Sequence, residues 1–171
     1  MTPEEFKSQV LPLKNKLYAF ALSLLSNTEE AKDVVQDIMV KVWEEDKDLN
    51  EYRNIEAWCM TLTRNRSLDR MKRKDYRQDD VATMHHLKQE DRDPFHALSE
   101  KELVMKVKKL VKKLPVLQRE IILLRDFQEH SYEEICEVLN IEMNQVKVYL
   151  HRARKFIKEE IKKLQVHGIQ S

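Results

Sequence analysis

Apolar residues recur every three or four positions through most of this chain, which is the spacing of one buried face of an α-helix. Three such stripes lie in the N-terminal part of the sequence, and each is followed by polar residues. The pattern predicts an all-α fold with helices over 3–25, 28–44 and 55–77, and it places both tryptophans in the core. The stripe positions are Phe6, Val10, Leu13, Leu17, Phe20 and Leu24, then Val34, Val35, Ile38, Val42 and Trp43, then Trp58, Leu62 and Leu68.

Capping residues mark where these helices begin. Thr2 precedes Pro3 and two glutamates, which is a typical helix start, and "SNT" at 26–28 ends the first helix and caps the second. The polar stretch 45–54 predicts a loop that closes with Asn54 as the next N-cap. The helix after it ends in a cluster of basic residues, where cations suit the helix dipole.

The C-terminal part repeats the same signals after a break. Residues 78–98 are acidic and lack a sustained period, so we expect a flexible linker there. Ser99 and Ser131 each stand three residues before a glutamate, the spacing of a capping box. Helices are predicted from 99 to 114, from 116 to 127, from 131 to 139, and from about 144 to 164, before Gly168. The chain therefore divides into two small helical domains, 1–77 and 99–171, joined by the linker.

The stretch "SYEEICEVLNIEMNQVKVYLHRARKFI" at 131–157 has the pattern of a helix-turn-helix. Ile135 and Leu139 would face inward from the first helix, and Val146 and Leu150 from the second. The turn lacks glycine, but Asn140 tolerates the left-handed backbone that such a turn uses. The side chains left outward on the second helix mix hydrogen-bonding and cationic groups, which suits a DNA major groove. They are Asn144, Gln145, Lys147, Val148, Tyr149, His151, Arg152 and Lys155. The alternative is a helical hairpin with a solvated basic face.

Charge and composition narrow the functional classes. The formal net charge of +1 hides blocks of −5 for residues 1–63, +5 for 64–77, −4 for 78–100 and +5 for 101–171. Two basic segments around an acidic one indicate a chain that grips a polyanion at two places. With one glycine the chain has no phosphate-binding loop, and no HExxH or nucleophile–base pattern is present, so we expect no enzyme and no cofactor.

Cysteine and histidine spacing gives no metal site. Cys59 and Cys136 stand far apart and are expected to be reduced and buried, and the adjacent His85 and His86 lack further spaced ligands. The apolar runs are too short to span a bilayer, so we expect a cytoplasmic protein without membrane insertion.

Three blocks of the sequence resemble the extracytoplasmic-function (ECF) sigma factors of bacterial RNA polymerase, in the order that this family has. "LYAFALSLLSNTEEAKDVVQDIMVKVWE" resembles the polymerase-binding segment, and "AWCMTLTRNRSLDRMKRK" the promoter-opening segment. "LPVLQREIILLRDFQEHSYEEICEVLNIEMNQVKVYLHRARKFI" resembles the reader of the minus-thirty-five element. The resemblance implies a protein that binds core RNA polymerase and promoter DNA, and that is held by an anti-sigma factor.

The resemblance also implies roles for particular residues. Asp33, Gln36 and Asp37 match the surface that docks on the largest catalytic subunit of the polymerase. Residues matching the minus-ten reading and melting segment are Tyr52, Arg53, Arg64, Asn65, Arg66, Arg70, Lys72 and Arg73. The outward face of the last helix would read the minus-thirty-five element. At 144, 145, 148 and 149 the chain departs from the common family pattern, so the resemblance does not predict which promoter sequence it would recognise.

Two other functions are compatible with parts of the pattern. A stand-alone helix-turn-helix regulator would use the second domain, but this function would not explain the exposed acidic residues at 33–37. A helical adaptor that binds only protein would leave the basic clusters at 64–77 and 147–163 unexplained.

Overall fold

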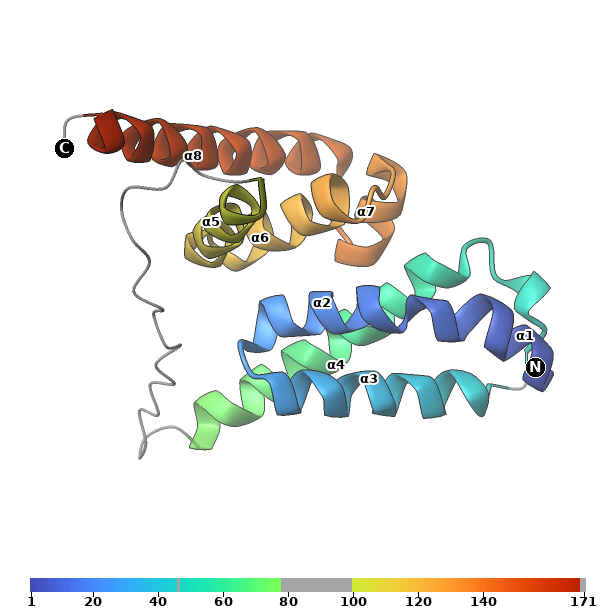
Figure 1. Ribbon diagram of the computed structural model, residues 1–171. Helices are drawn as coiled ribbons and strands as arrows, with labels where there is room; N and C mark the ends of the chain where they lie inside the picture. The colour runs from blue at the N-terminus through green and yellow to red at the C-terminus, as the bar shows by residue number, and fades with distance from the viewer. Residues whose placement is uncertain (46, 78–99, 170–171) are drawn as a thin grey trace.

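A computed structural model describes residues 1–45, 47–77 and 100–169, and every regular element in these ranges is helical. Two layers of helices pack against each other (Figure 1). One layer contains residues 3–77 and the other residues 100–169. The predicted all-α fold is thus confirmed, whereas the predicted linker 78–98, the cap at Ser99 and the pair His85–His86 lie outside the described residues.

The first predicted helix is interrupted. It consists of α1 (Pro3–Glu5), a π-helical turn (Phe6–Val10), a 3₁₀ turn (Leu11–Leu13) and α2 (Lys14–Leu25). Pro12 is the physical reason, because it has no N–H to donate and its ring clashes with the carbonyl four residues earlier. The predicted start is confirmed, since the Thr2 hydroxyl accepts from the backbone N–H of Glu5 and the Glu5 carboxylate accepts from that of Thr2.

Two further helices complete the N-terminal half. Asn27 caps α3 (Thr28–Trp43) through its side chain, and Asn54 caps α4 (Ile55–Arg77) by accepting from the N–H of Ala57 at 3.0 Å. The loop between them contains one 3₁₀ turn, Leu49–Glu51. Both predicted caps are confirmed, and the stripes of α2, α3 and α4 meet in a core that buries Leu17, Phe20, Val34 and Met60 completely.

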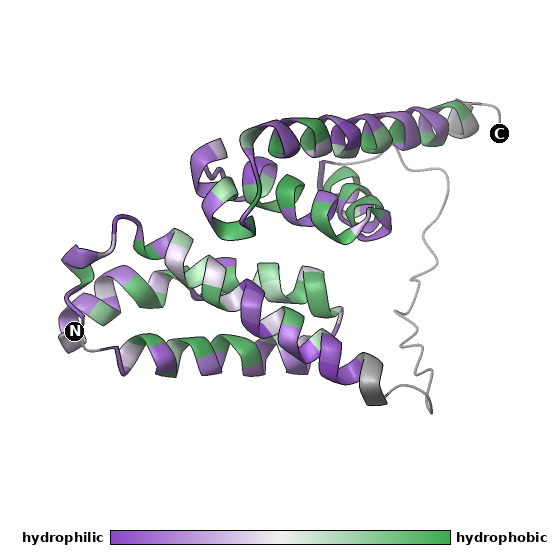
Figure 2. Ribbon diagram, turned by 180° about the vertical axis from the view of Figure 1, so that it is seen from behind, coloured by the Kyte–Doolittle hydropathy of each residue, from purple (hydrophilic) through white to green (hydrophobic). Residues whose placement is uncertain are grey.

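The C-terminal half begins with α5 (Glu100–Lys113), α6 (Val116–Ile122) and a π-helical turn (Leu123–Phe127). It ends with the predicted helix-turn-helix, formed by α7 (Tyr132–Leu139) and α8 (Met143–Ile169). The capping box of Ser131 with Glu134 is present, and Asn140 has φ 52° and ψ 51°, the left-handed conformation that the sequence predicted. Figure 2 shows α8 striped along its length, with hydrophilic and hydrophobic residues alternating at helical spacing.

Two sequence predictions are wrong. The last helix does not stop before Gly168 but continues to Ile169, because one glycine costs a helix only about 1 kcal/mol. Trp43 is not a core residue: it is 46% exposed at the end of α3, where its ring lies edge-on to that of Phe6 with centroids 5.4 Å apart. Trp58 is half-buried against the core.

The two halves touch through α4 with α7 and through α2 with α6. In Figure 1, α7 lies over the N-terminal part of α4. The contact of α4 with α7 covers part of the surface of α4, so it affects which α4 side chains are exposed.

Candidate nucleic-acid interface

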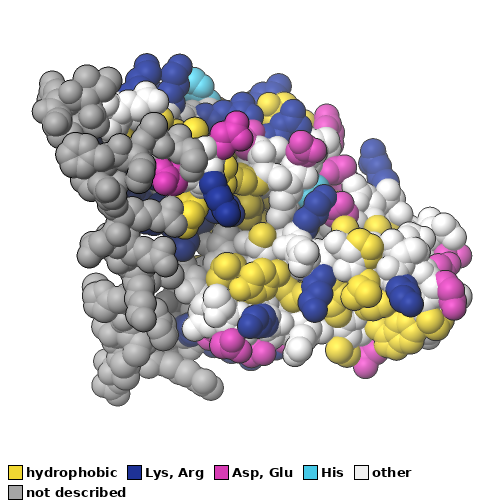
Figure 3. Space-filling model, viewed as in Figure 1, with side chains coloured by type: hydrophobic (Ala, Val, Ile, Leu, Met, Phe, Trp, Pro, Cys, Tyr) yellow, Lys and Arg dark blue, Asp and Glu magenta, His cyan; other side chains and the backbone are white. Residues whose placement is uncertain are grey.

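The outward face of α8 is formed as the sequence predicted. Val146, Leu150, Ala153 and Ile157 are buried at the i, i+4, i+7, i+11 spacing, which fixes the rotation of the helix. Seven of the eight predicted DNA-reading residues are exposed, and Tyr149 is half-buried. Basic side chains lie over α8 along the upper edge of the molecule in Figure 3. The helix therefore presents hydrogen-bonding groups near its N-terminus and cations further along, the arrangement that base edges and phosphates require.

Two residues of this face already have partners within the domain. The Gln145 side chain accepts a hydrogen bond from the backbone N–H of Glu142 at 3.1 Å and so caps the N-terminus of α8. The guanidinium of Arg152 lies over the ring of Tyr149, 5.7 Å from its centroid. This contact orients the arginine along the helix face, where its side chain stays exposed.

The predicted promoter-opening residues of α4 fall on three different faces. Arg64 points at the C-terminal half and Arg66 and Arg70 point at α3. Asn65, Lys72 and Arg73 are exposed and, at the i, i+7, i+8 spacing, share one face with exposed Asp69. The structure therefore does not bring the predicted set together, and only the third group is open to a nucleic acid.

The arginines that face α3 bind the acids predicted to dock on polymerase. Arg66 donates to Asp37 from Nε and from Nη2, and Arg70 reaches Asp33 at 3.6 Å and Asp37 at 3.5 Å. Lys74 extends the row, with its ammonium group 2.9 Å from Glu30. The acids on this side of α3 are thus neutralised within the domain. Gln36, the third predicted docking residue, lies on another side of α3, where it lines a hollow with Lys14, Asn15, Tyr18, Lys32 and Val35.

Tyr52 and Arg53 lie in the loop that precedes α4. The Tyr52 ring stacks on Trp58 with centroids 4.3 Å apart, and burial together with nearby Glu45 raises the pKa of its hydroxyl. Arg53 extends into solvent, with its side chain 92% exposed. Tyr52 and Trp58 form a ready aromatic surface of the kind on which an extruded base stacks.

Sequence reasoning missed one buried acid. Glu120 on α6 is fully buried, and its Oε1 accepts a hydrogen bond from Nε of Arg64 at 3.1 Å. Burial raises the pKa of this carboxyl, and the attraction of Arg64 opposes the shift only in part. Nothing in the pattern around Glu120 indicates that its partner comes from the other domain, 56 positions away.

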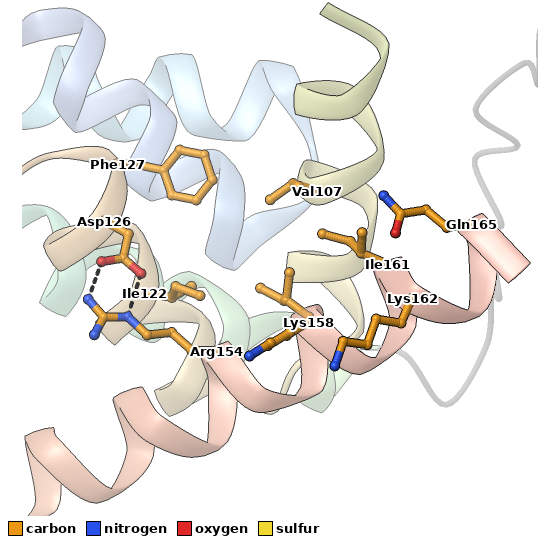
Figure 4. A pocket seen from close by; sticks show the side chains of 10 residues that line it. Val107, Ile122, Asp126, Phe127, Arg154, Lys158, Ile161, Lys162 and Gln165 are labelled. Atoms are coloured by element: carbon orange, nitrogen blue, oxygen red, sulfur yellow. Dashed lines mark hydrogen bonds and ion pairs between the residues drawn. The ribbon is translucent and has the colours of Figure 1, made fainter. Parts of the chain in front are cut away.

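An open groove of about 490 Å³ runs between α5, the turn after α6 and α8 (Figure 4). Its walls are apolar, from Val107, Ile122, Phe127 and Ile161. At one end Arg154 donates two hydrogen bonds to Asp126, which raise the pKa of the arginine. Lys158 and Lys162 of α8 line it as well.

Other kinds of site are not found in the described part of the chain. Residues 1–45, 47–77 and 100–169 contain no group of three or more histidine, cysteine or acidic side chains placed to hold a metal ion. Over the same residues, no helix has the length and apolarity to cross a membrane. Cys59 is buried and Cys136 half-buried, each without a disulfide partner there, and burial raises the pKa of Cys59 to about 12.

Comparison with known families assigns both halves. Residues 10–77 match Sigma-70 region 2, and residues 105–157 match Sigma-70, region 4. The chain is 28% identical to the ECF RNA polymerase sigma factor SigW of Bacillus subtilis over 160 residues, covering 88% of this chain and 86% of that protein. It is 30% identical to the RNA polymerase sigma factor YlaC of Bacillus subtilis, over 79% of each chain.

Solved structures show the same fold. The sigma factor RpoE of Bartonella quintana, in a crystal with the anti-sigma factor NepR, matches with a TM-score of 0.70 and 28% identity, over 93% of this chain and 98% of that one. CnrH, solved with the cytosolic domain of CnrY, matches in fold with a TM-score of 0.65 and 24% identity, over 95% and 90% of the two chains.

Proposed function

Because this chain belongs to the ECF sigma factors of RNA polymerase, we propose which of its surfaces acts in each step of promoter recognition, DNA melting and initiation. In this division α3 docks on core polymerase, α4 and the loop before it read and open the minus-ten element, and α8 reads the minus-thirty-five element. The observation that carries the proposal is the pair of exposed polar and basic faces, one on α4 and one on α8.

The docking surface extends beyond the acids of the predicted set. Asp33 and Asp37 supply carboxylates for basic side chains of the polymerase, although Arg66 and Arg70 must share or release them. The same helix also exposes Val40 to 56% and Trp43 to 46%, which supplies apolar area that exposed acids alone lack. Gln36 contributes from the neighbouring face of α3.

At the minus-ten element, separated strands need a cationic track and a surface for unstacked bases. Lys72 and Arg73 provide the cations on the exposed face of α4, and Asn65 adds a hydrogen-bonding amide on the same face. Tyr52, stacked on Trp58, provides the base platform beside Arg53. Arg64, Arg66 and Arg70 take part once DNA phosphates replace the carboxylates that they contact in this structure.

At the minus-thirty-five element, Asn144, Gln145 and Val148 sit where they can touch base edges near the N-terminus of α8. Lys147, His151, Arg152 and Lys155 follow as phosphate contacts. Tyr149 holds Arg152 rather than reading a base itself. The protein has no chemistry of its own in this proposal, acts in the cytoplasm with polymerase, and is held by an anti-sigma factor.

Run-off transcription with purified core polymerase tests the proposal. We expect transcription from matching promoters to require this protein and to be lost in Asp33→Arg/Asp37→Arg. A charge-swapped control separates docking from folding: Asp37→Arg with Arg66→Asp restores the ion pair inside the domain but reverses the surface. Because the swap also removes the contact of Arg70 with Asp37 at 3.5 Å, we expect it to melt slightly below the unaltered protein but above Asp37→Arg alone, and still to bind core polymerase weakly. Tight binding of this swapped variant would show that Asp37 has only a structural role.

A further inference from the structure

Gln145 is the third residue of α8, and the cap that it forms determines which way its amide group faces. Its Oε1 accepts a hydrogen bond from the backbone N–H of Glu142 at 3.1 Å. Since a backbone N–H can only donate, the amide oxygen is the atom turned back toward the start of the helix, and the NH2 group faces away from it. The side chain is exposed. Gln145 therefore presents a hydrogen-bond donor to a ligand of this face.

Val148 occupies the middle of the outward face of α8. Val146 and Leu150 are buried in the core, and Val148 lies two residues from each of them, which places it on the opposite side of the helix. Its side chain is 47% exposed. The residues three or four positions away surround it with polar and basic groups, at Asn144, Gln145, His151 and Arg152. An apolar side chain at this place suits an apolar group on the ligand.

Gln145 and Val148 are neighbours on the helix surface. Residues three apart in a helix have Cβ atoms about 5–6 Å from each other. The longer glutamine side chain can therefore donate to an acceptor that lies directly beside an apolar group packed on Val148. This pair of side chains is complementary to a base edge that carries an acceptor and an apolar group next to each other.

The four bases differ in these two groups on their major-groove edges. Thymine carries the acceptor O4 beside its C5-methyl group. Guanine offers acceptors without a methyl group, and cytosine offers an amino donor. Adenine pairs with glutamine when the amide oxygen and the NH2 group both face the base, whereas here the oxygen faces the backbone of Glu142. Thymine alone matches both side chains.

We propose that Gln145 and Val148 together read one thymine of the minus-thirty-five element. Gln145 donates to O4 of this thymine, and Val148 packs against its methyl group. The inference rests on the proposed function of α8 and names the base that two of its residues recognise. The cations of the same face hold phosphates, which carry no sequence information, so the choice of base at this position falls to Gln145 and Val148.

Base analogues in promoter DNA test the two contacts separately. Core polymerase with this protein first selects a minus-thirty-five element from promoters randomised there, and each thymine of that element is then replaced in turn. Deoxyuridine keeps O4 but lacks the methyl group, whereas C5-methylcytosine, paired with guanine, keeps the methyl group but replaces O4 by an amino group. We expect one thymine at which deoxyuridine weakens binding about threefold and methylcytosine roughly tenfold or more. Equal binding of thymine and deoxyuridine at every position would overturn the proposal.

Val148→Ala tests the methyl contact from the side of the protein. We expect this variant to bind the thymine and deoxyuridine promoters equally, because its side chain no longer reaches the methyl group. The matched control is Val166→Ala, the same change at a 52% exposed position near the other end of α8. The control should keep the preference of about threefold for thymine. A Val148→Ala protein with the same preference as the control would contradict the proposed contact.

Gln145→Glu tests the contact with O4. The variant keeps an acceptor for the N–H of Glu142 but replaces the outward donor by a second acceptor, which would repel O4 and accept from the amino group of cytosine. In a new selection from the promoter library, we expect the preferred base pair to change from T·A to C·G. Gln165→Glu adds the same charge at an exposed position near the other end of α8 and should still select T·A.

The position of the change decides whether the two side chains read the same base. If Gln145→Glu still selects T·A, or changes a different base pair from the one that Val148→Ala affects, the proposal of a shared thymine is wrong. Selection of no preferred minus-thirty-five sequence by the unaltered protein would instead count against the proposed function of α8, on which the inference rests.

Discussion

Arg66 donates two hydrogen bonds to the same carboxylate oxygen of Asp37, from Nε at 2.9 Å and from Nη2 at 2.8 Å. The two side chains were predicted to serve different partners, DNA for the arginine and polymerase for the acid. Their pairing links the two surfaces physically. Under the proposed function, a polymerase group that binds the Asp37 carboxylate would release the guanidinium of Arg66, which could then contact DNA.

A double-mutant cycle between Asp37→Ala and Arg66→Ala measures this link. Because both side chains are part-exposed, at 42% and 33%, the coupling in the free energy of unfolding should be only about 0.5–1 kcal/mol. Chemical denaturation of the four proteins gives the value. We further expect Arg66→Ala to leave binding to core polymerase unchanged or slightly tighter, because it removes one of the two arginines that contact Asp37, Arg70 being the other. Weaker binding to core polymerase would show that Arg66 itself contacts the polymerase.

The exposed stripe of α4 gives a prediction about salt dependence. Lys72→Ala and Arg73→Ala should each lower the magnitude of the slope of log affinity against log salt by about 1, because each removes one phosphate contact. Lys74→Ala is the matched control, since that lysine is turned toward Glu30 on α3. Titrations of the polymerase complex with promoter DNA at several salt concentrations give the slopes. If Lys74→Ala changes the slope as much as the other two, the division of α4 into faces is wrong.

Gln145 caps the N-terminus of α8 and is proposed to contact a base of the minus-thirty-five element. Two substitutions separate these roles. Gln145→Glu keeps an acceptor for the N–H of Glu142 and so keeps the cap, but it removes the amide donor that an adenine would need. We expect normal thermal stability with weaker binding to the minus-thirty-five element. Gln145→Ala should weaken both, with a stability loss of about 0.5–1 kcal/mol. Unaltered promoter affinity in Gln145→Glu would assign this residue to capping alone.

The sequence was sufficient to predict the parts of the fold that local chemistry determines. Caps at Thr2, Asn27, Asn54 and Ser131 follow from side chains that reach their own backbone, and the face of α8 follows from helical spacing alone. Pro12 could have predicted the break in the first helix, because its missing N–H is visible in the sequence. The exposed position of Trp43 could not be predicted, since its stripe continues past the point where the core ends.

The sequence could not predict which neighbouring residue each basic side chain of α4 contacts, and the reason is different. A run of basic residues shows that a helix carries charge, but not which neighbour each side chain faces. Arg64, Arg66 and Arg73 lie within ten positions of one another and face α6, α3 and solvent. The packing of α4 between the other helices sets these directions, and that packing depends on contacts between residues far apart in the chain. The pairing of Arg64 with Glu120 is the clearest example.

Asn140 stands in the turn between α7 and α8 at a position where glycine is common, and substitutions there test what stabilises the turn. Its backbone is left-handed, with φ 52° and ψ 51°, and the side chain is exposed. Asn140→Ala should lower the free energy of unfolding by about 1 kcal/mol, because a Cβ-bearing residue without a local hydrogen bond is strained there. Asn140→Gly should be close to neutral, since glycine adopts this conformation without strain but has more freedom to lose on folding. Thermal or chemical denaturation of the three proteins gives the order. A glycine variant as unstable as the alanine variant would mean that the asparagine side chain, rather than the backbone, stabilises the turn between α7 and α8.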